Sequence, residues 1–393
     1  MKQLLYKTIK ELEDSQDIQI IDGDRGKNYP KKEEFKSTGF CVFLNASNIK
    51  DDSFVFENID FISEEKDNVL RKGKLSRKDI VITTRGTVGL VAYYGDNILY
   101  DNMRINSGMI IIRVNSNVIN PNCFYQLLKS KSLKKQYQLF ASGCAQPQLP
   151  IQDFRLINIP IFSKTHQDKI AKVLSNYDDL IENNNKRIKI LEEMAQKIYK
   201  EWFVDFKFPG HETATFKQTE LGSEVMPKKG KNITKATIKE GNVPVVAGGI
   251  EPAYYHNVPN TVAPVITVSA SGANAGYINL YYQDIWASDC SYIDATMTPY
   301  VYYYYLLLKY NQIKVTNMQR GAAQPHVYPQ DLAQLKFDVP DENVIKMFNG
   351  LITPIFEQIA NLTLKNTNLK QTLDLLLPRL ISGEIDVENM EIK

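Results

Sequence analysis

The sequence contains few cysteines and histidines, and neither residue type is spaced as a metal site or a disulfide scaffold requires. The four cysteines are scattered over 393 residues without a CxxC pair, and the four histidines lie more than forty residues apart with no HExxH motif. Zinc sites and disulfide scaffolds both need denser patterns. We therefore expect reduced structural thiols and no bound metal.

Long apolar runs and an excess of one charge are also missing. The longest apolar run, Tyr300–Leu308, is far too short to span a bilayer. The segment Met1–Asp14 alternates charged and apolar residues and lacks the apolar core of a signal peptide. We expect a cytoplasmic protein without a membrane partner. Because the net charge is only +2, any nucleic-acid partner would have to be bound by locally concentrated positive groups.

Sequence motifs for catalysis are absent as well. There is no Asn-Pro-Pro or Asp-Pro-Pro segment of the kind that amino-methyltransferases use, no GxxxxGK[ST] phosphate loop, and no glycine fingerprint after a strand. The acidic pairs Asp178–Asp179 and Glu192–Glu193 are expected on the outer faces of helices. These absences predict a non-catalytic chain that binds no cofactor of its own.

The strongest positive feature is an internal repeat. The segment from Gly143 to Asp153 matches that from Gly321 to Asp331 at six of eleven positions, with an offset of 178 residues. Each copy is followed by a strand-like stretch that ends in proline and then by a long helical pattern. Upstream, 80–89 resembles 264–276, and both predict a strand that runs into a glycine-rich turn. Three matches in the same order indicate a duplication, and hence two similar α/β (α+β) domains with a pseudo-twofold relation.

The two helical segments carry apolar residues in alternating steps of three and four, as a coiled-coil seam requires. In the first helix the pattern runs from Ile170 to Trp202, and most positions recur 178 residues later, from Ile352 to Leu380. One simple interpretation is that each helix only covers its own neighbouring domain. The alternative is that the helices pair as an antiparallel coiled coil, which would form a rigid spacer.

One asparagine stands in each seam, and a buried seam asparagine can specify register. If Asn184 faces Asn366, an antiparallel pair would also bring together the apolar residues on either side of them. The predicted helix-pair interface comprises Ile181, Asn184, Ile188, Leu191, Ile359, Leu362, Asn366 and Leu369. The predicted segments are 1–162 (first domain), 163–207 (first helix), 208–342 (second domain) and 343–393 (second helix).

This order of domain, long helix, domain and long helix resembles the specificity subunits of type I restriction–modification systems. The likeness rests on 146–150 with its partner 324–329, on 86–89, on 188–206 and on 375–385, which together span most of the chain. The resemblance implies two target recognition domains, each of which recognises one part of a bipartite, asymmetric site in double-stranded DNA. The segments 300–305 and 242–255 have no obvious counterpart in the first half, so the two half-sites are expected to differ.

The resemblance also implies partners. Two methyltransferase subunits would bind along the helices, nuclease/translocase subunits would join them for cleavage, and S-adenosylmethionine and ATP would bind to those partners. The chain could equally serve a fused methyltransferase–nuclease. A different class of protein, a coiled-coil scaffold with duplicated heads, would show no salt-dependent affinity for DNA.

Side chains that contact bases need paired donors and acceptors, whereas phosphates attract cations, hydroxyls and backbone amides. Polar loops and the glycine turns supply such groups. The predicted DNA-binding residues of the first half are Arg25, Lys27, Thr84, Arg85, Thr87, Asn102, Arg104, Gln146 and Gln148. Those of the second half are Lys229, Lys231, Ser269, Ser271, Asn274, Arg320, Gln324 and His326.

These residues also have ordinary structural interpretations. Each cation could be a solvated surface residue, the glycine turns could be plain hairpins, and the glutamines of the duplicated loop could bond only to loop backbone. The tyrosines from 300 to 305 are expected in a helix packed on its domain and not in a base-stacking platform.

Overall fold

The computed structural model describes residues 5–143, 147–321, 325–382 and 384–385. The chain divides into two compact units. Unit 1 comprises Met1–Glu182 with Thr367–Lys393, and unit 2 comprises Asn183–Asn366. Among the described residues, no helix combines the length and apolar content needed to cross a bilayer.

Unit 1 is built around a four-stranded antiparallel sheet in the order β2-β10-β7-β8. A three-stranded sheet, β6-β3-β9, pairs β3 with β9 in parallel. The strands of these two sheets are β2 (Ile18–Asp22), β3 (Cys41–Leu44), β6 (Asp60–Ile62), β7 (Ile80–Thr83), β8 (Val91–Tyr93), β9 (Met103–Ile105) and β10 (Met109–Val114). The remaining strands form the pairs β1 (Leu5–Thr8) with β11 (Asn158–Ile161) and β4 (Ile49–Lys50) with β5 (Ser53–Phe54).

Short helices cover the sheets of unit 1, and local sequence explains where they begin. Thr8 accepts a hydrogen bond from the backbone of Glu11 and Asn120 caps a helix whose first residue is Pro121, both common N-terminal signals. These helices are α1 (Ile9–Asp14), α2 (Glu64–Val69), α3 (Pro121–Leu128), α4 (Lys131–Phe140), α5 (Ile151–Phe154) and the 3-10 turns η1 (Lys32–Glu34) and η2 (Ala46–Asn48).

Unit 2 repeats this plan. Its four-stranded sheet has the order β13-β19-β16-β17, and its three-stranded sheet, β15-β14-β18, again has one parallel pair. The strands are β12 (Phe216–Glu220), β13 (Lys228–Lys229), β14 (Val243–Val246), β15 (Tyr254–His256), β16 (Val265–Ser269), β17 (Ile278–Tyr281), β18 (Trp286–Ala287), β19 (Cys290–Asp294) and β20 (Lys336–Pro340). The short helices are α7 (Leu221–Glu224), α8 (Val301–Tyr310), α9 (Gln312–Thr316), α10 (Pro329–Ala333) and the 3-10 turns η3 (His211–Thr213) and η4 (Gly272–Asn274).

The strand orders correspond one to one, so the predicted duplication and mixed helix–sheet fold are confirmed. The expectation that 242–255 and 300–305 lack counterparts is wrong. The strands β14 and β15 occupy the places of β3 and β6, and the tyrosine-rich α8 follows its sheet as α3 does in unit 1. Packing explains the divergence, because a helix or strand needs apolar side chains at these positions but not particular ones.

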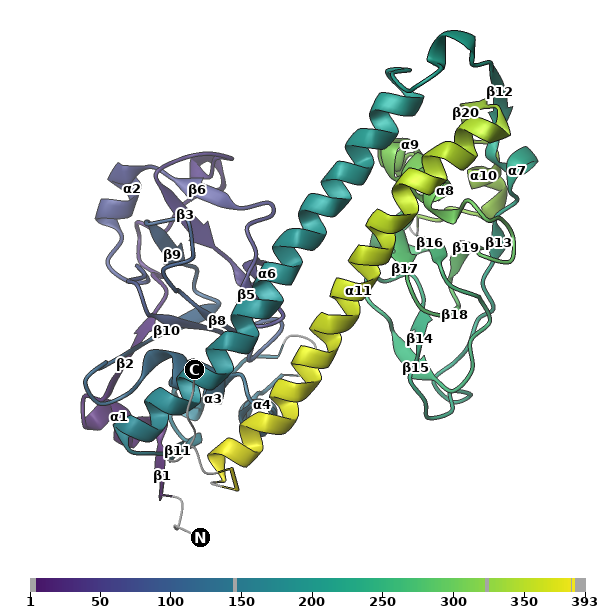
Figure 1. Cartoon of the computed structure of the whole chain (residues 1–393). Coiled ribbons are helices and arrows are strands. Elements are labelled where there is room, and N and C mark those ends of the chain that lie inside the picture. Colours follow the sequence, from purple (N-terminus) through teal and green to yellow (C-terminus); the bar gives the residue numbers. More distant parts are fainter. Residues whose placement is uncertain (1–4, 144–146, 322–324, 383, 386–393) are drawn as a thin grey trace. The chain divides into compact units, whose positions relative to one another are not determined.

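Two 40-residue helices are present, α6 (Lys164–Phe203) inside the predicted segment 163–207 and α11 (Glu342–Ile381), which begins one residue before the predicted segment 343–393. Each helix is divided between the units. In unit 1, Ile170 and Leu174 of α6 join the same buried cluster as Leu377 and Leu380 of α11. In unit 2 the opposite ends share a core that contains Ala195, Tyr199 and Phe203 with Phe348, Ile352 and Ile359. Within each unit the helices therefore run antiparallel (Figure 1) and also belong to the domain core.

The predicted asparagine contact is present in unit 2. The Asn184 Nδ2 donates to Asn366 Oδ1 over 2.8 Å, and both side chains are 8% exposed. The Asn366 Nδ2 in turn donates to Asn185 Oδ1 over 2.8 Å. Leu362 and Ile359 are buried, whereas Ile188 and Leu191 are partly buried against the same core. The seam asparagines thus meet in the register that their positions predicted.

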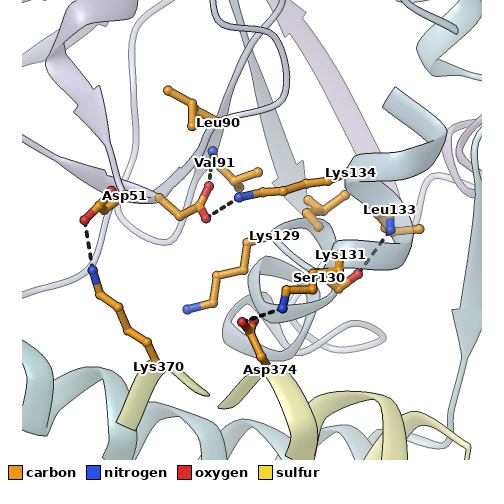
Figure 2. Close-up of polar contacts among 12 residues, drawn as sticks. Asp51, Leu90, Val91, Lys129, Ser130, Lys131, Leu133, Lys134, Lys370 and Asp374 are labelled. Atoms are coloured by element: carbon orange, nitrogen blue, oxygen red, sulfur yellow. Dashed lines mark hydrogen bonds and ion pairs between the residues drawn. The ribbon is translucent and has the colours of Figure 1, made fainter. Parts of the chain in front are cut away.

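In unit 1, polar contacts attach the end of α11 to the β4–β5 hairpin and to α4 (Figure 2). Lys370 Nζ lies 2.9 Å from Asp51 Oδ2, and Lys131 Nζ lies 2.8 Å from Asp374 Oδ2. The neighbouring Asp52 accepts from Lys134 Nζ at 2.6 Å and from the Val91 backbone at 3.1 Å. The hairpin is therefore held by charged groups on two helices.

Candidate nucleic-acid interface

The glycine-rich turn that follows β7 in unit 1 is closed by hydrogen bonds of the Thr83 hydroxyl. The Thr83 hydroxyl donates to the carbonyl of Thr87 over 2.5 Å and accepts from the Leu90 N–H over 2.9 Å. Gly86 has a φ of +73°, a conformation that side chains disfavour. The turn consequently presents Arg85 and Thr87 to solvent, and both are exposed.

The duplicated loop packs on this turn. Ser142 and Gln148 exchange two backbone hydrogen bonds of 2.8 Å, and the Leu149 N–H donates to the Thr84 carbonyl over 2.9 Å. An isolated β-bridge joins Arg85 to Gln148, which is exposed. The loop therefore places Gln148 beside Arg85, whereas Gln146 lies outside the described residues.

Unit 2 repeats the same contacts between its own turn and loop. Arg320 and His326 exchange two backbone hydrogen bonds of 2.9 Å, and the Val327 N–H donates to the Ala270 carbonyl over 3.0 Å. A β-bridge joins Ser271 to His326. The predicted Gln324 lies outside the described residues. The turn and the duplicated loop are thus one structural element that occurs once in each unit.

A third loop packs on the glycine turn in each unit. It connects the small sheet to the large sheet, between β9 and β10 in unit 1 and between β18 and β19 in unit 2. In unit 1 the Thr84 N–H donates to the Gly108 carbonyl over 2.8 Å, and in unit 2 the Ala270 N–H donates to the Asp289 carbonyl over 3.2 Å. A glycine after the edge strand packs against the same loop, since a Cβ on Gly23 or Gly230 would lie 2.2 Å from a backbone oxygen. Only glycine allows this close approach.

The predicted cations lie close to these glycines in the chain: Arg25 and Lys27 follow Gly23, and Lys229, the last residue of β13, and Lys231 flank Gly230. Arg25 donates to the Ser107 carbonyl over 3.2 Å and to Asp22 over 3.3 Å, with its side chain 51% exposed. Burial alone would raise the pKa of Asp24, but hydrogen bonds from the Gly26 and Arg71 backbones lower that pKa below its usual value. Lys27, Lys229 and Lys231 are also exposed.

Several predicted DNA contacts do not fit the structure. The prediction for Arg104 is wrong, because its side chain is 4% exposed and its guanidinium binds Asp67 and the Lys72 and Leu70 carbonyls. Thr84 and Ser269 are 6% and 4% exposed, so they support the turns from inside and are not available to a partner.

Three further predicted residues differ in their position and in their contacts. Asn102 directly precedes β9, at the opposite end of this strand from the Gly108 loop, so the fold does not bring it to the turn. Arg320 is exposed but forms an ion pair with Asp331, and Asn274 closes the unit 2 turn through its carbonyl bond to the Tyr277 N–H.

Asp289 is not among the predicted residues, although it lies in the third loop of unit 2 beside the predicted Ser271. The Ser271 hydroxyl donates to Asp289 Oδ2. An alignment of the strands that follow the third loops, β10 and β19, would have placed Asp289 opposite Gly108. The predicted free thiols are confirmed for Cys41, Cys123 and Cys290, and burial raises the pKa of each to about 12.

No group of His, Cys, Asp or Glu within the described ranges is placed to hold a metal ion. A family model described as the type I restriction modification DNA specificity domain matches residues 9–193 and 212–375. The chain belongs to the type I restriction–modification DNA specificity family. The two matches confirm both the predicted family and the predicted repeat of its domain.

Two named relatives and one solved structure are similar to this chain. The specificity subunit of the type I restriction enzyme MjaIX from Methanocaldococcus jannaschii is 25% identical over 344 residues, which cover 79% of this chain and 78% of the relative. The HindI specificity subunit from Haemophilus influenzae is 27% identical over 187 residues, covering 47% and 40%. A crystal structure of a type I S subunit from M. genitalium covers 97% of both chains with a TM-score of 0.55 and 18% identity, a likeness of fold alone.

Proposed function

We propose that the chain binds double-stranded DNA at a bipartite, asymmetric target, with each unit recognising one half-site. The observation that carries this proposal is the arrangement of edge-strand loop, glycine turn and duplicated loop, which is built twice on equivalent sheets but carries different side chains. The same scaffold would therefore dock on DNA in the same way in each unit, while the exposed residues select different bases.

The side chains on these loops, and on the end of β13 beside them, suit the two kinds of contact that DNA recognition requires. Arg25, Lys27, Lys229 and Lys231 are exposed cations that could neutralise phosphates, and such contacts make affinity fall steeply with salt. Arg85 with Gln148, and Ser271 with His326, combine donors and acceptors at the centre of each arrangement. Central residues would thus contact bases, and peripheral cations would contact the backbone.

The chain would act without catalysis of its own. In this proposal, methyltransferase subunits bind the specificity subunit, hold S-adenosylmethionine and modify a base at the bound site, and nuclease/translocase subunits with ATP join for cleavage. Relatives that are named as specificity subunits of type I restriction enzymes support this division of labour. The complex would operate in the cytoplasm, where the DNA is.

The test is to co-express the chain with its methyltransferase partner and to map methyladenine across a host genome by single-molecule sequencing. We expect a split, asymmetric motif that disappears when the chain is omitted. A methylation pattern that is unchanged without the chain, although the complex forms, would contradict the proposal and favour a scaffold.

Two substitutions sharpen this test. Arg85→Ala should relax one base position in one half-site, where a good base contact contributes about 1–3 kcal/mol of discrimination. Lys10→Ala removes an exposed cation from α1, outside the three loops, and should leave the motif unchanged. Equal effects of the two variants would show that Arg85 is an ordinary surface cation.

A further inference from the structure

The third loops of the two units differ at one equivalent position. The strands fix the equivalence, because Met109 pairs with Thr83 in unit 1 as Cys290 pairs with Ser269 in unit 2. The preceding residues, Gly108 and Asp289, both accept a hydrogen bond from the backbone of the glycine turn. A glycine in unit 1 is therefore replaced by a carboxylate in unit 2.

The neighbouring turn residue also differs between the units, with the charged side chain in unit 1 and the neutral one in unit 2. Arg85 follows Thr84 in unit 1, and Ser271 follows Ala270 in unit 2. The Arg85 side chain is exposed, and no hydrogen bond or ion pair joins its guanidinium to another described residue. Since a guanidinium only donates hydrogen bonds, unit 1 presents donors at this position.

Unit 2 presents acceptors instead. The single hydroxyl proton of Ser271 is directed at Asp289 Oδ2, and both residues are partly exposed, so their remaining side-chain lone pairs can only accept. Gly248 packs behind them, since a Cβ placed there would lie 2.9 Å from the Ser271 carbonyl and 3.4 Å from Asp289 Oδ2. Within the described part of the chain, no other side chain donates to this carboxylate.

We propose that Asp289, oriented by Ser271, is a specificity-determining residue that accepts a hydrogen bond from the exocyclic amino group of a base in the second half-site. This inference rests on the proposed function. Phosphates repel a carboxylate, and the minor groove is strongly negative in narrow tracts, so a carboxylate suits the major groove. The amino groups there are N4 of cytosine and N6 of adenine, and other edges offer only acceptors or a methyl group.

The first experiment compares the methylation motif of the wild-type complex with that of Asp289→Ala. We expect the variant to accept other bases at one position of one half-site, with discrimination reduced about tenfold, while the other half-site stays unchanged. Asp338→Ala is the matched control, because it removes an exposed carboxylate of the same unit in β20. The motif of the control should equal that of the wild type.

A second measurement isolates the contact itself. The bound duplex is compared with one in which the amino group of the implicated base is replaced by hydrogen. The wild-type complex should lose affinity about tenfold, whereas Asp289→Ala should bind both duplexes equally. A similar loss in both proteins would mean that another residue contacts the amino group, and the proposal would be overturned.

A transplant tests the equivalence of the loops. Arg85→Ser with Gly108→Asp should give unit 1 the acceptor pair and change one base of its own half-site. The aspartate requires a small shift of the Asn106 side chain, because a Cβ on Gly108 would lie 3.2 Å from Asn106 Oδ1, whereas the Arg85 Cβ is 3.8 Å away.

The outcomes separate the two proposals. A motif that depends on the chain but is unaltered by Asp289→Ala leaves the function standing and sinks the role of Asp289. Loss of all methylation in Asp289→Ala and in Asp289→Asn, with an active Asp338→Ala control, would make Asp289 a folding residue and would also overturn the inference. A motif independent of the chain would remove the proposed function itself.

Discussion

The small three-stranded sheets of the two units share strand order and strand directions but are stabilised by different chemistry. In unit 1, Arg104 on the parallel strand β9 is buried against Asp67 of α2. The equivalent position on β18 of unit 2 holds Trp286, whose ring meets His256 edge-on at 5.1 Å. The same strand pairing is therefore compatible with a buried ion pair in one unit and with an aromatic contact in the other.

The largest loss of stability is expected from breaking the Arg104–Asp67 ion pair of unit 1, where Trp286 stands at the equivalent position of unit 2. Asp67→Ala would leave the Arg104 guanidinium buried without a carboxylate, and should destabilise unit 1 by about 3–5 kcal/mol. Denaturant unfolding combined with limited proteolysis would show loss of protection in unit 1 while unit 2 stays protected. Glu64→Ala, an exposed carboxylate on the same helix, is the control and should have little effect.

The pair of Asp67 and Arg104 also predicts that the stability of unit 1 depends on pH. Burial raises the pKa of Asp67, but the hydrogen bonds and charges of Lys74 and Arg104 outweigh it and lower the pKa below 3.8. A carboxyl with a lowered folded-state pKa contributes stability above its unfolded pKa and loses it as the pH falls through the folded value. Unit 1 should thus lose the contribution of Asp67 below pH 3.8, a change absent in Asp67→Leu with Arg104→Met. An identical acid transition in that double variant would contradict this account.

The next largest loss of stability is expected in the helix seam, whose heptad pattern occurs in both α6 and α11. Asn184→Leu would leave the buried Asn366 Oδ1 without its donor and should cost about 1–3 kcal/mol. Adding Asn366→Leu should restore or exceed the wild-type stability, because two apolar residues then fill the seam. Thermal unfolding of both variants would measure this coupling, and equal, additive losses would show that the asparagines do not act as a pair.

Features that recur with a period could be predicted from the sequence, and features that depend on a single tertiary neighbour could not. The heptad phase and the asparagine pair were predictable because helix geometry places residues 3 and 4 apart on one face. The glycine turns were also predictable from positive-φ requirements. The sequence alone predicts a DNA contact for Arg104, because nothing near it in sequence reveals that Asp67 of α2 packs against it. Asp289 was missed for the same reason, since its partner Ser271 is 18 residues away.

A smaller loss of stability is expected from substitutions in the β4–β5 hairpin, which has no counterpart in the described part of unit 2. Its two turn residues, Asp51 and Asp52, have φ values of +48° and +57°, as a two-residue hairpin turn requires. Asp52→Ala should cost unit 1 about 1–2 kcal/mol, through backbone strain and loss of the Lys134 contact. Asp52→Gly should recover the backbone part only, and equal stabilities of the two variants in thermal unfolding would show that strain is negligible.

The smallest effect is expected from Asp51→Asn, because the ion pair with Lys370 is exposed. The Asp51 and Lys370 side chains are 81% and 52% exposed, so water and salt screen their 2.9 Å contact. Asparagine keeps the positive-φ preference of the turn, and the loss in stability should stay below about 1 kcal/mol and vanish near 1 M salt. If Asp51→Asn instead matched the loss in Asp52→Ala, independently of salt, this contact would be a main support of the hairpin. In that case the ion pair with Lys370, and not the positive-φ conformation of the turn, would explain the aspartate at position 51.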